Sequence, residues 1–255
     1  MREMKLGILL LTSAGLGLPA WACAYDTCQV REPREATVDA AGAATVRVEA
    51  KAGSLRITGE EGLTEVRAHG EACARSRQSL EKVQLRAERS GDEVRVVVDI
   101  PERWGEPAAL DLEVRVPAGV AVHVEDGSGE VEVDGVASLR LRDGSGEIDV
   151  TDVGGDVTIH DSSGEVDVVD VEGSVVLEDG SGEIDVNDVR GSVTVEADGS
   201  GDIEIRGVGE NVLIRRDGSG DIHVEDVDGD FTVEEDGSGD ITHERVQGRV
   251  TVPER

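Results

Sequence analysis

Apolar and polar residues alternate along the second half of the chain, in short runs separated by corners that contain glycine. In the unit that starts at Asp143 the sequence reads DGSGEIDVT and then DVGGDVTIH. An alternation of period two predicts β-strands that bury one face. The residues expected inside this unit are Ile148, Val150, Val153, Val157 and Ile159. Each unit is therefore predicted to hold two short strands.

The corners carry a repeated tetrapeptide, Asp-Gly-Ser-Gly, with one variant copy that reads Asp-Ser-Ser-Gly. The copies start at Asp126, Asp143, Asp161, Asp179, Asp198, Asp217 and Asp236, in steps of 17 to 19 residues. A period this regular indicates a stacked repeat protein. We therefore predict an all-β fold, a two-faced parallel β-solenoid with 17–19 residues per turn. A motif used seven times is expected to form the corners of this coil, because glycine adopts positive φ without steric cost.

The first half of the chain is less regular. We expect residues 36–120 to form an irregular β-rich cap with the first degenerate rungs, and residues 121–255 to form the regular solenoid. The elements expected in the cap are strands at Thr45–Glu49, Ser54–Thr58 and Thr64–Ala68, a short helix or loop at Glu71–Leu80, and a hairpin within Val83–Ile100.

The amino terminus has the pattern of a secretory signal. Arg2 and Lys5 precede an apolar run that is too short to span a membrane, and Ala20-Trp21-Ala22 fits a signal-peptidase site. We interpret residues 1–22 as a cleaved signal peptide, with cleavage after Ala24 as an alternative, and residues 23–35 as a linker. No other segment could cross a membrane. The mature protein is expected in the periplasm, on the outer-membrane surface or in the medium.

The three cysteines fit an exported protein. Cys23 follows the predicted cleavage site, where a bacterial lipoprotein carries its acyl chains, but the preceding residues match the usual lipobox poorly, so a lipid anchor is not favoured. Cys28 and Cys73 remain, and either a disulfide between them or two free thiols is compatible with the sequence. The absence of a CxxC motif argues against zinc.

The net charge of −31 is concentrated at fixed positions of the repeat. An acid follows each tetrapeptide, and these acids are Glu130, Glu147, Glu165, Glu183, Asp202, Asp221 and Asp240. A second acidic column is expected two residues further on, so one face should be strongly negative. Such a field argues against nucleic acid and anionic lipid as partners. We expect no cofactor beyond weak association of calcium or another cation with the seven acids, because the corners lack the Asp spacing of calcium-binding nonapeptide repeats.

The opposite face is expected to be nearly neutral. Its middle outward column comprises Arg140, Thr158, Val176, Thr194, Leu213, Thr232 and Thr251. This column is the better candidate for contact with a glycan or protein surface of the cell envelope, although threonine also suits a strand for its β-propensity alone. The histidines are scattered, and no spacing typical of a catalytic triad occurs, so we expect no enzyme.

Four features are typical of one family: the exported start, the degenerate unit Gly53-Ser54-Leu55-Arg56-Ile57-Thr58-Gly59, the link from Val114 to Gly119, and the Ser-Gly-acid-apolar runs. With them the chain resembles the bacterial β-strand-repeat family commonly labelled "putative adhesin", a domain of unknown function. The resemblance covers roughly residues 36–252. It implies a surface or envelope protein and supplies no catalytic residues. The function expected is a non-enzymatic adhesin or scaffold with flat faces for multivalent binding. The alternatives are a cation-associated structural module and, more remotely, a solenoid enzyme acting on polysaccharides.

Overall fold

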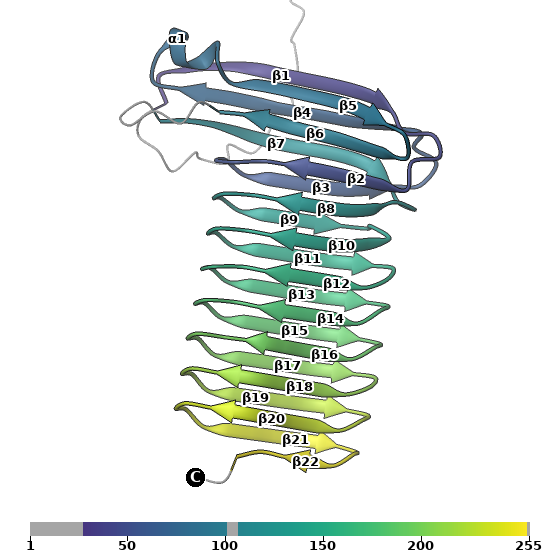
Figure 1. Ribbon diagram of the computed structural model, residues 1–255, viewed down its shortest axis with the longest axis vertical. Coiled ribbons are helices and arrows are strands. Elements are labelled where there is room, and N and C mark those ends of the chain that lie inside the picture. The colour runs from purple at the N-terminus through teal and green to yellow at the C-terminus, as the bar shows by residue number, and fades with distance from the viewer. Residues whose placement is uncertain (1–27, 101–106, 254–255) are drawn as a thin grey trace, which may run out of the picture.

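The computed structural model describes residues 28–100 and 107–253 and consists of two eleven-stranded sheets that face each other along a rod (Figure 1). From Ala108 onward the chain alternates between the two sheets, so that each turn contributes one strand to each sheet. Consecutive turns pair in parallel, as in the pairing of Ile148 with Val131 on one side and with Val166 on the other. The predicted parallel β-solenoid is confirmed.

One sheet, called sheet A here, runs from the cap to the carboxyl end of the rod. In spatial order its strands are β1 (Val30–Asp39), β4 (Glu65–Ala74), β7 (Ala108–Pro117), β3 (Leu55–Glu60), β9 (Val131–Asp134), β11 (Ile148–Val153), β13 (Val166–Val171), β15 (Ile184–Val189), β17 (Ile203–Val208), β19 (Ile222–Val227) and β21 (Ile241–Val246).

The facing sheet is called sheet B. In spatial order from the cap its strands are β5 (Gln84–Ser90), β6 (Glu93–Asp99), β2 (Thr45–Glu49), β8 (Ala121–Glu125), β10 (Ser138–Arg142), β12 (Val157–His160), β14 (Val175–Glu178), β16 (Val193–Ala197), β18 (Val212–Asp217), β20 (Phe231–Asp236) and β22 (Val250–Thr251). A single helical turn, α1 (Arg77–Leu80), lies in the cap.

The core is a slab of Val, Ile and Leu side chains between the sheets. The five residues predicted to be inside the unit at Asp143 are each at most 1% exposed. Val153 belongs to a column of valines that closes one edge of the slab, at the corner where the chain leaves sheet A. The other members of that column are Val136, Val171, Val189, Val208 and Val227. The hydrophobic effect of burying these stacked layers holds the turns together.

The second glycine of each tetrapeptide is required by the close approach of successive turns. Gly182 has φ +151°, and a Cβ placed there would overlap the carbonyl oxygen of Gly164 in the preceding turn. The first glycine has no positive φ, so Ser162 can adopt its backbone conformation in the variant copy. A Cβ at this position nevertheless approaches the preceding turn, as at Gly180, where it would overlap the carbonyl oxygen of Ser162. The motif is therefore a corner, as expected.

The cap closes the first end of the rod with antiparallel strands. β1 pairs with β4, β4 with β7, and β5 with β6, all antiparallel, whereas β2 and β3 join the parallel ladder. The expected helix or loop at Glu71–Leu80 is wrong in its first part, because Glu71–Ala74 continues β4. Strand β1 begins at Val30, so part of the segment expected to be a linker is paired.

Cys28 and Cys73 are joined by a disulfide, with Cα atoms 5.5 Å apart. The bridge ties the start of the described chain to β4, whose neighbouring strand is β1. The predicted signal peptide and Cys23 lie outside the described residues. Within residues 28–100 and 107–253, no helix has the length and apolar character needed to cross a membrane.

Candidate binding faces

The acidic face lies on sheet A, and its middle column is in register from turn to turn. Glu132 pairs with Asp149, Asp149 with Asp167, Asp167 with Asp185, and Asp185 with Glu204. The column then continues through His223 and Thr242. The order predicted from the repeat is confirmed. Like charges one strand spacing apart, about 4.8 Å, destabilise each other.

The seven acids that follow the tetrapeptides lie at the start of the sheet A strands. Six of them are exposed, and Glu130 is half-buried. Two of them also bind backbone through one carboxylate oxygen, since Asp202 accepts a hydrogen bond from the amide of Asp221 (2.8 Å) and Asp221 from the amide of Asp240 (2.8 Å). In the described part of the chain no three acidic, histidine or cysteine side chains converge on a point suited to a metal ion. Diffuse association of cations with these acids stays a prediction.

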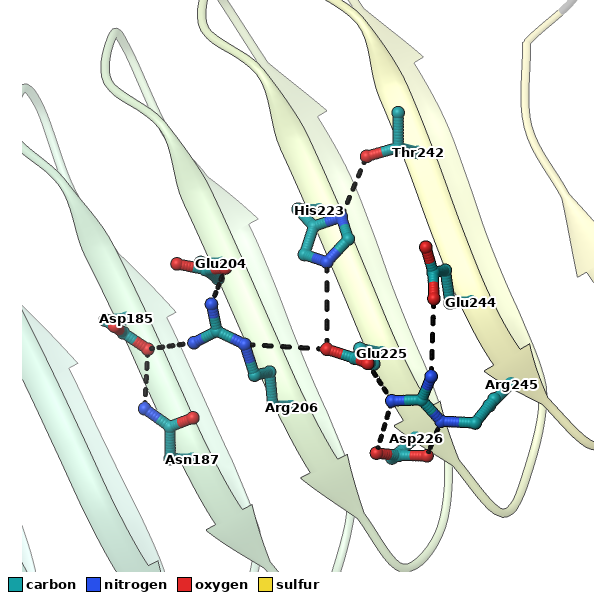
Figure 2. Close-up of polar contacts among 10 residues, drawn as sticks. All are labelled: Asp185, Asn187, Glu204, Arg206, His223, Glu225, Asp226, Thr242, Glu244 and Arg245. Carbon is teal, nitrogen blue, oxygen red and sulfur yellow. Dashed lines mark hydrogen bonds and ion pairs between the residues drawn. The ribbon is translucent and has the colours of Figure 1, made fainter.

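Arginines neutralise the carboxyl-terminal part of the acidic face (Figure 2). Arg206 forms ion pairs with Glu204, with Asp185 (3.7 Å) and with Glu225 (3.7 Å). Arg245 similarly contacts Glu225 and both carboxylate oxygens of Asp226, at 2.5 and 2.9 Å. Arg206 occupies the outward position that holds Thr151 and Val169 in earlier turns. Arg245 lies one residue further along its strand than the equivalent position.

The middle turns of this face retain an unneutralised strip of carboxylates, Asp149 and Asp167. Before the strip Glu132 is paired with Arg56. After it Asp185 is paired with Arg206. Within the described ranges no lysine or arginine forms an ion pair with Asp149 or Asp167. Partial burial raises the pKa of Asp167, and the charges of Asp185, Asp149 and Glu165 raise it further. The strip centred on Asp167 is therefore where the face would gain most from a cation or a basic partner.

The neutral column on sheet B is also in register. Arg140 pairs with Thr158, Thr158 with Val176, and Val176 with Thr194. The column then continues through Leu213, Thr232 and Thr251. The five central side chains are half-buried, which gives a flat surface of hydroxyl and methyl groups.

The cap end of the same column is basic, which the sequence did not reveal. His123 lies between Arg140 and Arg47, and Arg47 lies beside Arg95. Burial lowers the pKa of His123, and the two flanking arginines lower it further. Glutamates balance part of this charge, as in the ion pair between Arg47 and Glu125 (3.0 Å). The column arises because β2 inserts between β6 and β8, a neighbour relation that no local pattern encodes.

The first residue of each tetrapeptide forms a column that our sequence reasoning missed. These aspartates lie at the corner where the chain leaves sheet B, opposite the valine edge of the slab, and point inward. Their side chains are mostly buried, and Asp198 and Asp217 are each only 2% exposed. The signal was available: Val157 and Ile159 point inward, so the same alternation places Asp161 inside.

Together these features define a capped, two-faced β-solenoid with one acidic and one neutral face. The chain belongs to the Toastrack family DUF4097, whose model matches residues 35–252. The resemblance inferred from the repeat motifs is thereby confirmed. A comparison with curated protein sequences finds no match.

A comparison with solved structures finds several similar chains at low sequence identity. A protein named "putative adhesin" from Bacteroides fragilis NCTC 9343 is 13% identical, with 89% of this chain and 99% of that chain covered and a TM-score of 0.47. A protein named "putative lipid binding protein" from Parabacteroides distasonis ATCC 8503 is 12% identical, with 88% and 97% covered and a TM-score of 0.45. Another "putative adhesin", from Parabacteroides merdae ATCC 43184, is 11% identical, with 89% and 97% covered and a TM-score of 0.44.

Proposed function

We propose that this chain is a non-catalytic, exported protein of the cell envelope that binds partners through its flat faces, as an adhesin or a scaffold. The observation that carries the proposal is the register of the faces. Each outward position recurs once per turn, about 4.8 Å apart, on both sheets. A partner with a repeating or extended surface could then make several weak contacts at once, and their combined avidity exceeds that of each contact.

The neutral column of sheet B is the face proposed to contact an envelope protein or a glycan. Its hydroxyl groups can exchange hydrogen bonds with sugar or peptide groups, and Val176 and Leu213 add apolar area between them. Export is supported by the predicted signal at residues 1–22.

An array of glycans and envelope proteins probed with the mature chain tests this role. Thr194→Glu adds a charge to the middle of the neutral column and should weaken binding to any partner found. Asn187→Glu adds the same charge to the acidic face, on β15 of the same turn, and should leave that binding intact. Equal loss in the two variants would contradict the assignment of the neutral face, and silence of the array would contradict the binding role.

Cation association is the second candidate, and the unneutralised strip around Asp167 favours it. We expect thermal stability to rise with calcium chloride and with sodium chloride, because counter-ions relieve the repulsion within the strip. At matched ionic strength, equal rises indicate screening alone. A larger rise with calcium that Asp167→Asn abolishes would instead indicate bound calcium.

A further inference from the structure

The buried aspartate column is an unusual component of a protein core. Its members stack turn on turn because their backbones continue the ladder of sheet B, as in the bond from the amide of Asp161 to the carbonyl of Glu178 (2.8 Å). Five of the seven side chains are at least nine-tenths buried: Asp143, Asp161, Asp179, Asp198 and Asp217. Buried carboxylates are costly unless their charge is balanced or removed.

The carboxylate oxygens of this column lack donors. Both oxygens of Asp143, Asp198 and Asp217 are buried without a hydrogen-bond partner. Asp161 and Asp179 each accept one bond from the amide of the next residue, both at 2.7 Å, which leaves their second oxygen unsatisfied. An ionised carboxylate can only accept, so two adjacent carboxylates cannot satisfy each other until one of them holds a proton.

The side chains lie in groups that a single proton could bridge. The backbone register stacks these carboxyl groups about one strand spacing apart, as where Asp198 lies beside Asp217 and Asp217 beside Asp236. Hydrogen bonding between neighbouring side chains affects their pKa within three groups, which are Asp126 with Asp143, Asp161 with Asp179, and Asp198 with Asp217 and Asp236. The three groups follow each other along the rod. A protonated carboxyl that donates to a neighbouring carboxylate forms a short, strong hydrogen bond.

No positively charged group is among the main causes that shift the pKa of the six aspartates from Asp126 to Asp217. The charged groups that act on them are column members of neighbouring turns. Backbone amides of the same corner, such as those of Gly199 and Ser200, lower the pKa of Asp198 in part, although neither forms a well-aligned hydrogen bond with it. On the cap side, Ala50 occupies the column position beside Asp126.

We propose that the buried aspartate column is a proton-binding site, in which aspartates of adjacent turns share protons and so tighten the solenoid as the medium becomes mildly acidic. The ligand is the hydrogen ion, and about one proton is held by each of the three groups. The site is independent of the proposed binding faces, because its side chains point into the core.

The electrostatics of the column agree with this site. Burial raises the pKa of Asp126 and of Asp217 to about 7, and that of Asp179 and of Asp198 to about 6, and the charge of a neighbouring aspartate adds to each increase. An unfolded aspartate loses its proton near pH 3.8. Between that pH and about 7 the folded chain therefore binds more protons than the unfolded chain. Stability must fall as the pH rises through this window, and the contribution is lost above about pH 7.

The test is the pH dependence of urea unfolding of the mature chain between pH 5 and pH 8, in high sodium chloride to screen surface repulsion. An uptake of about three protons on folding changes the folding equilibrium constant by up to about 1000-fold per pH unit. Asp179→Asn can donate an amide hydrogen to Asp161 without a bound proton. We expect this variant to reduce the pH dependence by about one proton, or about tenfold per pH unit.

Glu183→Gln is the matched control, because it removes one charge from an exposed position beside the same corner. It should keep the wild-type pH dependence. The same slope in Asp179→Asn as in the wild type would overturn the proposal. So would a slope that disappears when calcium chloride is added to the same high-salt buffer, since the oxygens would then hold a metal ion rather than protons.

A second measurement covers the case in which Asp179→Asn fails to fold. Infrared spectra of the wild-type chain at pH 6 should contain the carbonyl absorption of protonated carboxyl groups, and this absorption should disappear by pH 8. Ordinary aspartates and glutamates are ionised at both values. Identical spectra at pH 6 and pH 8 would overturn the proposal without any variant.

Discussion

Gly182→Ala tests the claim that the second glycine of the tetrapeptide sets the distance between turns. Gly182 has φ +151°, a backbone conformation that residues with a Cβ rarely adopt. Because Gly182 has no Cβ, there is room for the carbonyl oxygen of Gly164. An alanine must therefore both strain its own backbone and push the two turns apart at this corner.

The two effects can be added from the structure. The strained φ costs about 1–3 kcal/mol. Separation of the two turns weakens the bond from the amide of Gly164 to the carbonyl of Ser181 (2.9 Å) and that from the amide of Val166 to the carbonyl of Glu183 (2.9 Å), each worth about 1 kcal/mol. The expected loss of unfolding free energy is about 3–5 kcal/mol, a large share of the about 5–15 kcal/mol typical of a domain. For a chain of this size that corresponds to a melting temperature lower by roughly 10 °C.

Thermal and urea unfolding followed by circular dichroism measure this loss. Gly42→Ala is the control, because Gly42 has φ +74° but no atom lies within 4 Å of the position that a Cβ would occupy there. Its cost should stay at about 1–2 kcal/mol, that of the strained backbone alone. Gly180→Ser copies the residue present in the variant corner and should cost less than Gly182→Ala. If Gly182→Ala costs no more than Gly42→Ala, close approach of the turns does not explain the motif.

Three further substitutions probe other contacts. Cys73→Ser opens a bridge across 45 residues and should lower stability by about 4 kcal/mol, as should reduction of the wild type; no effect of reductant on the melting temperature would show that the bridge is absent. Arg206→Gln should cost only about 0.5 kcal/mol, because its ion pairs are partly exposed, and the difference from the wild type should vanish in high salt. Phe231→Ala removes a fully buried ring and should cost about 3–4 kcal/mol. Hydrogen exchange should then quicken in β20–β22 while β8–β14 keep their protection, whereas uniform quickening would indicate that the rod unfolds as one unit.

The regular rungs could be predicted from the sequence because each unit contains the same alternation and contacts only its neighbours. The inward positions of Ile148 and Val157, and the stacking of Asp149 on Asp167, follow from the period alone. The aspartate column was missed for a different reason. The alternation predicts that the side chain of Asp161 points inward, but a charged residue is not expected in a core. The backbone nevertheless continues the same alternation through that residue.

The cap was harder to predict because its partners are distant in the chain. Glu71–Ala74 is polar and rich in alanine, which locally suits a helix or a loop. It forms a strand because β1 and β7 bind it on both sides, and because the bridge from Cys73 to Cys28 holds its end. Likewise, β2 pairs with β8, which lies far from it in the sequence, and the period of the repeat does not predict this pairing. These contacts are set by tertiary structure rather than by propensity.

Because the turns are uniform, the length of the rod is set by the number of turns. Since every turn adds about 4.8 Å and presents the same corner on both sides, duplication or loss of a whole unit of 17–19 residues would change the reach of the rod without altering the cap. A partial unit would not be tolerated, because it would place a side chain where a neighbouring backbone needs a glycine. Related chains can therefore differ in length in discrete steps, and the distance from the cap to the far end becomes a property that whole-unit duplication can adjust.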